Sequence, residues 1–241
     1  MRELQSYLRV RTEEYGRLPL FAHLRDTGVD ARERLAFVPA LAHFVMTFAD
    51  LYALVLRQEP PQDKFQEIVN AHTYEDGGHW KWFLADLAIL DQDPTARYSE
   101  FLKYVWDDST RNIRMLSYRI CRLGIGADSL SKLVLVQCIE AAGKVSLEAA
   151  APVGREVGSR LGKKLVYFGP HHLDTESDHT LEEADTHSWL ESVEIDASRR
   201  PQLRHIIDES FEAFTAFSEE VLRVSKGGPA LPRIKPHSRE T

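Results

Sequence analysis

The sequence has little cysteine: only Cys121 and Cys138 occur among its 241 residues, and they do not form a CxxC motif. This scarcity argues against a disulfide framework and against a thiolate zinc site, and it favours a reducing, cytoplasmic environment. The chain also lacks a long basic run, because 30 Lys and Arg residues are outnumbered by 37 Asp and Glu residues, for a net charge of −7. We therefore expect no nucleic-acid partner and no binding to an anionic membrane.

No apolar leader is visible at the start of the sequence. Segment 1–15 carries charged residues throughout, so we expect no signal peptide. The most apolar stretch, residues 35–56, contains Pro39, His43 and Asp50, which the interior of a bilayer would penalise. This stretch therefore predicts a buried core helix of a soluble protein and not a membrane span.

Apolar residues recur at helical spacing along nearly the whole chain, and no convincing alternating strand is found. Proline, glycine and aspartate residues at suitable positions mark where helices begin and end. The pattern predicts one all-α domain over residues 1–228, followed by a loose tail over residues 229–241. The expected helices are 3–18, 20–25, 31–57, 62–90, 96–107, 110–123, one from 128 to beyond 151, one that begins at 169–170, and 201–226.

The first candidate site lies on the expected helix 62–90. Successive helical residues turn by about 100°, so His72, His79 and a carboxylate, Glu75 or Asp76, face one direction. Histidines and carboxylates at such spacings hold metals in helical bundles. The alternative is a solvated polar face with incidental histidines. The glycine pair after Asp76 weakens the helix by about 1 kcal/mol per residue, which favours a compensating role such as a bulge or clearance for a substrate.

The second candidate site is a repeat of the same donor types. His172, Glu176 and His179 fall on one helical stripe about 60° wide, and the spacing between the histidines equals that of the first site. Chance occurrence on a surface accounts for a single triplet of this kind, but it is a much poorer explanation for two triplets on separate helices. Imidazoles mixed with carboxylates suit non-haem iron, and manganese or zinc less distinctively.

Glu140 lies in the middle of the most apolar expected helix. A buried carboxylate must be paired, protonated or bound to a metal. Lys144, one turn further on, allows an ordinary i, i+4 ion pair. A dinuclear site held by four histidines still needs a bridging carboxylate, however, which favours a metal ligand. Gly143 beside it is expected to let neighbouring helices approach closely.

The candidate ligands follow one another in an order that resembles a known family, the haem-oxygenase-like diiron oxidases, whose fold is shared by thiaminase-like and pyrroloquinoline-quinone-synthase-like proteins. The resemblance covers about residues 35–179. Its most specific parts are the His-x3-Glu-x2-His motif and the 32-residue distance from Glu140 to that motif. In members of this family, the first helix that carries metal ligands often has a Glu seven residues before its His. At the position seven residues before His79, this chain has His72 instead. Which of His72, Glu75 and Asp76 coordinates a metal stays open. The resulting ligand set is His72, Glu75, His79, Glu140, His172, Glu176 and His179.

The resemblance implies a single-domain helical bundle of the haem-oxygenase-like type that binds two Fe(II) ions and uses O2 as a co-substrate. It also implies a homodimer, an external electron donor and a small-molecule substrate. Family members oxidise amino acids and small carboxylates by N-oxygenation, C–C cleavage or nitrile formation. We expect Glu140 and Lys144 to act in catalysis, and either Lys144 or a nearby arginine to hold a substrate carboxylate.

Two other functions fit the same sequence. A metal-free, thiaminase-like hydrolase would use Cys138 as a nucleophile beside Glu140, although these residues point about 200° apart on a helix. A haem- or iron-binding protein without turnover would use other histidines as axial ligands. The available residues are His23, His43, His187 and His205.

Overall fold

The computed structural model describes residues 1–176, 184–229, 231 and 232, and all regular secondary structure in them is helical. The all-α prediction is therefore confirmed for the described part of the chain. Most of the expected tail 229–241 lies outside the described residues, as does His179. The buried side chains of the described helices form a continuous hydrophobic core, as expected for a single-domain bundle.

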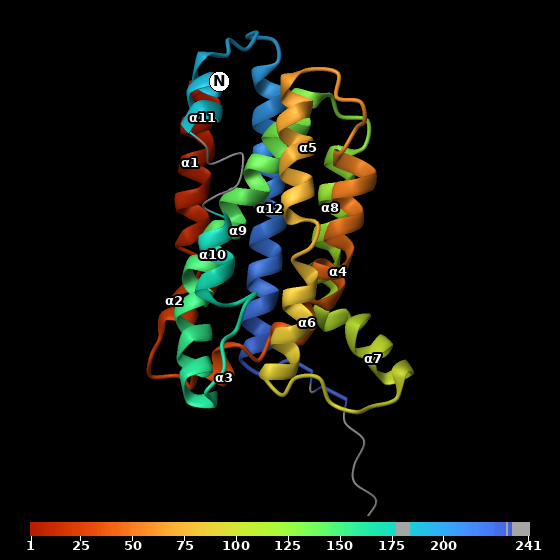
Figure 1. Cartoon of the computed structure of the whole chain (residues 1–241), viewed down its shortest axis with the longest axis vertical. Coiled ribbons are helices and arrows are strands. Elements are labelled where there is room, and N and C mark those ends of the chain that lie inside the picture. The colour runs from red at the N-terminus through yellow and green to blue at the C-terminus, as the bar shows by residue number, and fades with distance from the viewer. Residues whose placement is uncertain (177–183, 230, 233–241) are drawn as a thin grey trace, which may run out of the picture.

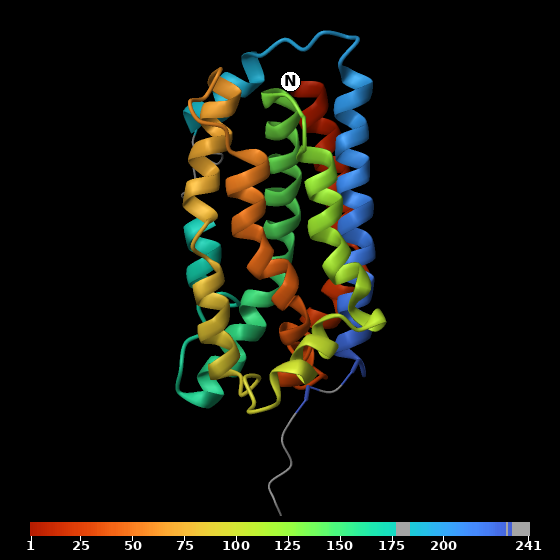
Figure 2. The same cartoon turned by 90° about the vertical axis from the view of Figure 1, so that its right-hand side faces the viewer.

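Two long helices, α9 (Ser129–Leu161) and α12 (Arg200–Ser225), run along much of the length of an elongated bundle (Figure 1). Helix α9 contacts most of the others, including α5 (Lys64–Asp76), α10 (Pro170–Glu176) and α12. In a view turned by 90°, α5 and α6 follow one another along one side of the bundle (Figure 2). The remaining helices are α1 (Arg2–Gly16), α2 (Pro19–Arg25), α3 (Ala31–Arg34), α4 (Ala42–Leu51), α6 (Trp80–Ile89), α7 (Tyr98–Val105), α8 (Arg111–Gly124) and α11 (Ala184–Ser192).

Helix α9 has clear start and stop signals. The carboxylate of Asp128 accepts a hydrogen bond from the backbone N–H of Ser131 at 2.9 Å, and Gly162 ends the helix with φ of 63°. Inside the helix, Gly154 permits a close contact, because a Cβ atom there would lie 1.9 Å from the carbonyl oxygen of Phe168. This contact brings the loop that precedes α10 directly onto α9.

The expected helix 31–57 is wrong as a single element. The segment divides into α3, a 3-10 turn (Val38–Leu41), α4 and a π-helical turn (Tyr52–Leu56). Pro39, in the first turn of the 3-10 segment, explains the interruption, because proline has no backbone N–H and cannot continue the helix that precedes it. Ala31–Leu56 is apolar and long enough to cross a membrane by composition alone, but its buried side chains join the core of the bundle.

The expected helix 62–90 is also divided. Helix α5 ends at Asp76, Gly77 is its C-cap, and α6 begins at Trp80. The glycine pair supplies the physical reason, because glycine is a poor helix former. Helix α11 has no counterpart among the sequence predictions. Helices α1, α2, α7, α8 and α12 agree with their predicted ranges to within a few residues, and α9 and α10 begin where predicted.

Candidate metal centre

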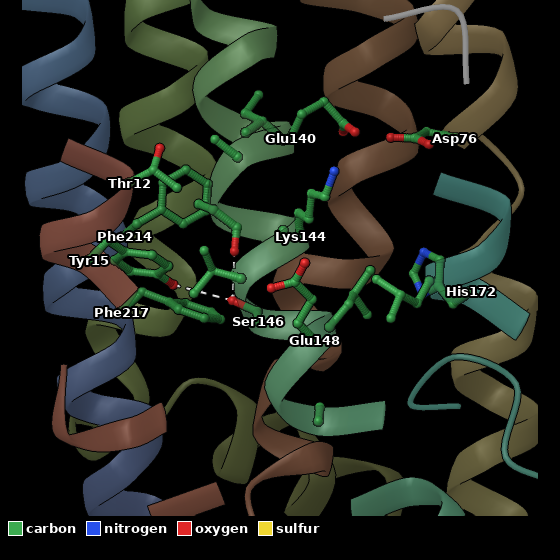
Figure 3. Close-up of a pocket in the computed structure, with 18 of the residues that line it drawn as sticks. Thr12, Tyr15, Asp76, Glu140, Lys144, Ser146, Glu148, His172, Phe214 and Phe217 are labelled. Carbon is green, nitrogen blue, oxygen red and sulfur yellow. Dashed lines mark hydrogen bonds between the residues drawn. The ribbon is translucent and has the colours of Figure 1, made fainter. Parts of the chain in front are cut away.

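Three side chains from α5 and α9 converge at the centre of the bundle. His72 and Asp76 lie one turn apart on the buried face of α5, and Glu140 faces them from the middle of α9. One potential ligand atom from each lies within 4.8 Å of the others. Figure 3 shows the carboxylates of Asp76 and Glu140 directed toward one another from the two helices. We call these three residues the inner cluster.

The spacing within the inner cluster fits a bound metal ion. His72 Nε2 lies 3.1 Å from Glu140 Oε1 and 3.2 Å from Asp76 Oδ2. Two ligand atoms that each lie about 2.1 Å from one ion are separated by about 3.0–3.4 Å in octahedral or tetrahedral geometry. Two of the three donor pairs therefore already have the separation that a shared ion would require.

The buried environment controls the charge of the inner cluster. Burial alone would lower the pKa of His72, but Glu140 and Asp76 outweigh it and raise this pKa well above the usual range for histidine. Without a metal, a proton on His72 therefore offsets part of the carboxylate charge. A metal ion would replace that proton, because a coordinating imidazole nitrogen must be deprotonated.

Tyr52 holds the inner cluster in place from the π-helical turn. Its hydroxyl donates a hydrogen bond to Asp76 Oδ2 at 2.9 Å and lies 3.2 Å from His72 Nε2. The Tyr52 ring is completely buried and packs against Phe48 at 4.4 Å between ring centroids. Nothing in the sequence pattern indicated this residue, because the π-helical turn that directs it inward has no sequence signal of its own.

A pair of histidines lies beside the inner cluster. His79, immediately before α6, and His172 on α10 approach to 3.1 Å between His79 Nδ1 and His172 Nε2. His79 Nδ1 also lies 3.6 Å from Asp76 Oδ1, which joins the pair to the cluster. His172 Nδ1 contacts the carbonyl oxygen of Tyr167 at 2.9 Å. Because a carbonyl can only accept, Nδ1 carries the proton and Nε2 faces the site.

Asp86 fixes the loop that orients His172. Its carboxylate lies on α6, is fully buried, and accepts hydrogen bonds from the backbone N–H groups of Val166 at 2.8 Å and Phe168 at 2.9 Å. These bonds hold the intervening Tyr167, whose carbonyl positions His172. Burial raises the pKa of Asp86, although its backbone hydrogen bonds act in the opposite direction. Asp86 was not predicted from the sequence, although it is an acidic residue within an apolar helix. The same pattern identified Glu140.

The structure thus brings together four of the expected ligands, His72, His79, Glu140 and His172. Glu75 has an exposed side chain and is not part of the inner cluster. The carboxylate in that place is Asp76, because it continues the buried stripe of α5 one turn after His72. Glu176 ends α10, but its side chain and the whole of His179 lie outside the described residues.

A cavity of about 640 Å³ opens beside the candidate metal centre. Asp76, His79, Glu140 and His172 line it at one end, and Lys144 lies one turn from Glu140 in the same wall (Figure 3). Most of the remaining wall is apolar and aromatic. The expected close helix approach at Gly143 is wrong, because a Cβ atom added there would meet nothing within 4 Å.

The residues required by the two other functions have different surroundings. Cys138 is fully buried, and burial raises the pKa of its thiol to about 12, so almost no thiolate nucleophile forms at neutral pH. Among the histidines considered for haem, His23 contacts Ser225 Oγ at 3.0 Å and His43 contacts the hydroxyl of Tyr118 at 3.3 Å. His187 lines the cavity, but not within the inner cluster.

No protein-family model matches this chain, and no curated protein matches it either. The chemistry available to the site therefore has to be judged from its donor atoms, their spacing and the cavity beside them.

Proposed function

We propose that this protein is a non-haem diiron oxidase or oxygenase of the haem-oxygenase-like type, which uses O2 to oxidise an amino acid or a similar small carboxylate. The observation that carries the proposal is the convergence of His72, Asp76 and Glu140 beside the His79–His172 pair. Nitrogen and oxygen donors from four helical segments meet there at the edge of a cavity.

The donor set favours iron over harder cations. Magnesium and calcium prefer sites built of oxygen ligands, whereas a mixture of imidazoles and carboxylates suits iron, manganese or zinc. In this arrangement the inner cluster would hold one ion. His79 and His172 would help to hold a second ion. The order of these residues along the chain supports the family resemblance.

Two bound ferrous ions would supply the electrons that activate O2. The chain's own residues have three tasks around them. Tyr52 and the Tyr167 carbonyl orient the side chains that would bind the metal ions. Trp82 stacks on His79, with 4.3 Å between the ring centroids, and shields one side of the site from water. Lys144 would bind the substrate carboxylate at the cavity wall, so that the reacting carbon lies beside the metal centre.

Anaerobic titration with Fe(II) tests this function directly. We expect two ions per chain, and O2 consumption that begins only when a suitable amino acid or small acid is added. His72→Ala should abolish O2 consumption and the binding of the ion at the inner cluster, whereas Glu219→Gln, which changes an exposed residue on α12, should change neither. A protein that takes up no iron, or an iron-loaded protein that consumes no O2 with any such acid, contradicts the proposal. A Soret band would favour a haem protein instead.

A further inference from the structure

Three oxygen atoms surround one nitrogen of the inner cluster. His72 Nε2 lies 3.1 Å from Glu140 Oε1 and 3.2 Å from Asp76 Oδ2. The phenolic oxygen of Tyr52, Oη, lies 3.2 Å from the same nitrogen. Because an imidazole nitrogen carries at most one hydrogen, it cannot donate a full hydrogen bond to all three oxygens. A cation shared by these atoms accounts for all three contacts.

Tyr52 Oη completes a compact triangle with two of the donor atoms in the inner cluster. It lies 3.2 Å from His72 Nε2 and 2.9 Å from Asp76 Oδ2, and those two atoms are 3.2 Å apart. Ligand atoms that each lie about 2.1 Å from one ion are about 3.0–3.4 Å apart. All three sides of the triangle therefore have nearly the dimensions of one face of a metal coordination sphere.

A clamp between α5 and the π-helical turn holds Tyr52 at this position. The side-chain amide of Gln66 donates a hydrogen bond to the carbonyl oxygen of Leu56 at 2.9 Å. Asn70 binds both polar groups of the Gln58 backbone, accepting from its N–H at 3.1 Å and donating to its carbonyl oxygen at 2.8 Å. Turns of the π type are rare and frequently mark functional sites. The clamp stabilises this turn and so fixes the phenol against the inner cluster.

We propose that Tyr52 is a further ligand of the inner cluster, which binds Fe(III) through its phenolate oxygen. The assignment rests on the proposed function only in that iron occupies the inner cluster. It requires neither turnover nor a particular substrate.

The chemistry of a phenol suits the oxidised ion in particular. Tyrosine is an iron ligand in some haem proteins, and phenolate is a hard, anionic oxygen donor that prefers Fe(III) to Fe(II). A ligand atom must be deprotonated, so the O–H bond breaks as the Fe–O bond forms, and the proton passes to solvent. With Fe(II) bound, the phenol keeps its proton and its hydrogen bond to Asp76. Tyr52 therefore lowers the reduction potential of the inner ion, because it binds only the ferric state.

Visible absorption of the Fe(III)-loaded protein tests the assignment without O2 or substrate. Fe(III) is added under argon as its nitrilotriacetate complex, and unbound iron is removed by gel filtration. A phenolate bound to Fe(III) produces an intense charge-transfer band in the visible region, whereas carboxylate and imidazole ligands produce no comparable band there. Resonance Raman excitation within the band should enhance phenolate ring vibrations, which shift in protein grown with ring-deuterated tyrosine. Bound Fe(III) without the band, or a band without tyrosine vibrations, would overturn the proposal.

Tyr52→Phe is the decisive variant, because it keeps the buried ring and removes only the ligand atom. We expect it to lose the band and to bind Fe(III) more than about 100-fold more weakly, with Fe(II) affinity lower by only about tenfold. A tyrosine that acts only as a hydrogen-bond donor predicts equal losses for the two ions, so equal losses or a retained band would contradict the assignment. Tyr104→Phe changes another buried tyrosine, on α7 outside the inner cluster, and should keep both the band and the affinities.

Tyr167→Phe distinguishes Tyr52 from a second tyrosine beside the candidate metal centre. The rings of Tyr167 and His172 lie 4.7 Å apart between centroids. The band should survive this substitution, and its loss would assign the band to Tyr167 and overturn the proposal. If Tyr52→Phe does not fold, a tyrosine band that survives in both Tyr104→Phe and Tyr167→Phe supports Tyr52 as the ligand, whereas its loss in either variant refutes it.

The outcomes separate this inference from the proposed function. If the tyrosine band forms but the iron-loaded protein consumes no O2 with any small acid, the oxidase function fails and the ligand assignment stands. If O2 is consumed but bound Fe(III) gives no tyrosine band, the oxidase function stands and the assignment fails. A protein that binds neither Fe(II) nor Fe(III) overturns both.

Discussion

The two halves of the candidate metal centre are built in different ways. The inner cluster of His72, Asp76 and Glu140 lies within α5 and α9, and His72 is completely buried. The other half, His79 and His172, lies at the junction before α6 and on the short α10. Packing of the bundle positions the first half, whereas a hydrogen-bonded loop positions the second. We therefore expect substitutions to affect the two halves separately.

The largest effect should come from the inner cluster itself. His72→Ala or Glu140→Ala removes a donor that the rest of the cluster cannot replace, so metal affinity should fall by more than about 100-fold. His172→Ala should instead leave one ion bound, since the inner cluster stays intact. Metal content after dialysis measures both, with Glu219→Gln as the control. Loss of both ions in His172→Ala would show that the halves are not independent.

Metal binding should stabilise the fold, because the bound state is available only to the folded protein. At an ion concentration of 100 Kd the gain is about 2.7 kcal/mol, which corresponds to roughly 5–10 °C in melting temperature for a chain of this size. Calorimetry with and without Fe(II) under argon measures the shift. In Glu140→Ala the same concentration of iron should produce almost none, and a full shift there would place the metal elsewhere.

Much of the fold could be predicted from the sequence, because helical periodicity and end signals are local. Asp128 and Gly162 delimit α9, and the apolar middle of this helix made Glu140 conspicuous. His72 and His79 lie at the same site, although the helix is interrupted between them. Gly77 and Gly78 interrupt the helix, yet the chain turns so that His79 still faces the site.

What could not be predicted depends on tertiary packing. Periodicity left Glu75 and Asp76 as near equals, and only the packing of α5 on α9 buries one of them. Tyr52 reaches the site through a π-helical turn that no local pattern marks. The aromatic wall of the cavity joins residues from α4 and α12, far apart in the chain, so neither helix alone indicates a cavity.

Asp86→Asn tests whether the second half depends on its loop. The substitution removes one of two acceptors for the backbone N–H groups of Val166 and Phe168, so the Tyr167 carbonyl should no longer hold His172 firmly. We expect affinity for the second ion to fall about 10–100-fold, with the first ion retained. Stepwise Fe(II) titration resolves the two. Loss of both ions with an unchanged melting temperature would contradict the division into halves.

Tyr52→Phe tests the first half in the same way, with a smaller effect. The ring remains to pack against Phe48, but Asp76 loses a donor and His72 a neighbour. We expect binding of the first ion to weaken about tenfold, and the free energy of unfolding of the metal-free protein to fall by about 1–3 kcal/mol. Denaturant unfolding and Fe(II) titration measure the two quantities. An effect confined to the second ion would assign Tyr52 to the other half.

Cys138→Ala should have the smallest effect, because Cys138 belongs to neither half. It lies two residues before Glu140 on α9, but its thiol is buried against α12 through Ser210, and its pKa of about 12 keeps it protonated. We expect unchanged metal content and O2 consumption, and a free energy of unfolding lower by about 1 kcal/mol. Cys121→Ala, at the less buried cysteine, is the matched control. A thiolate nucleophile would require the opposite result, lost activity at full metal content, and burial of this depth leaves no route for a substrate to reach the sulfur.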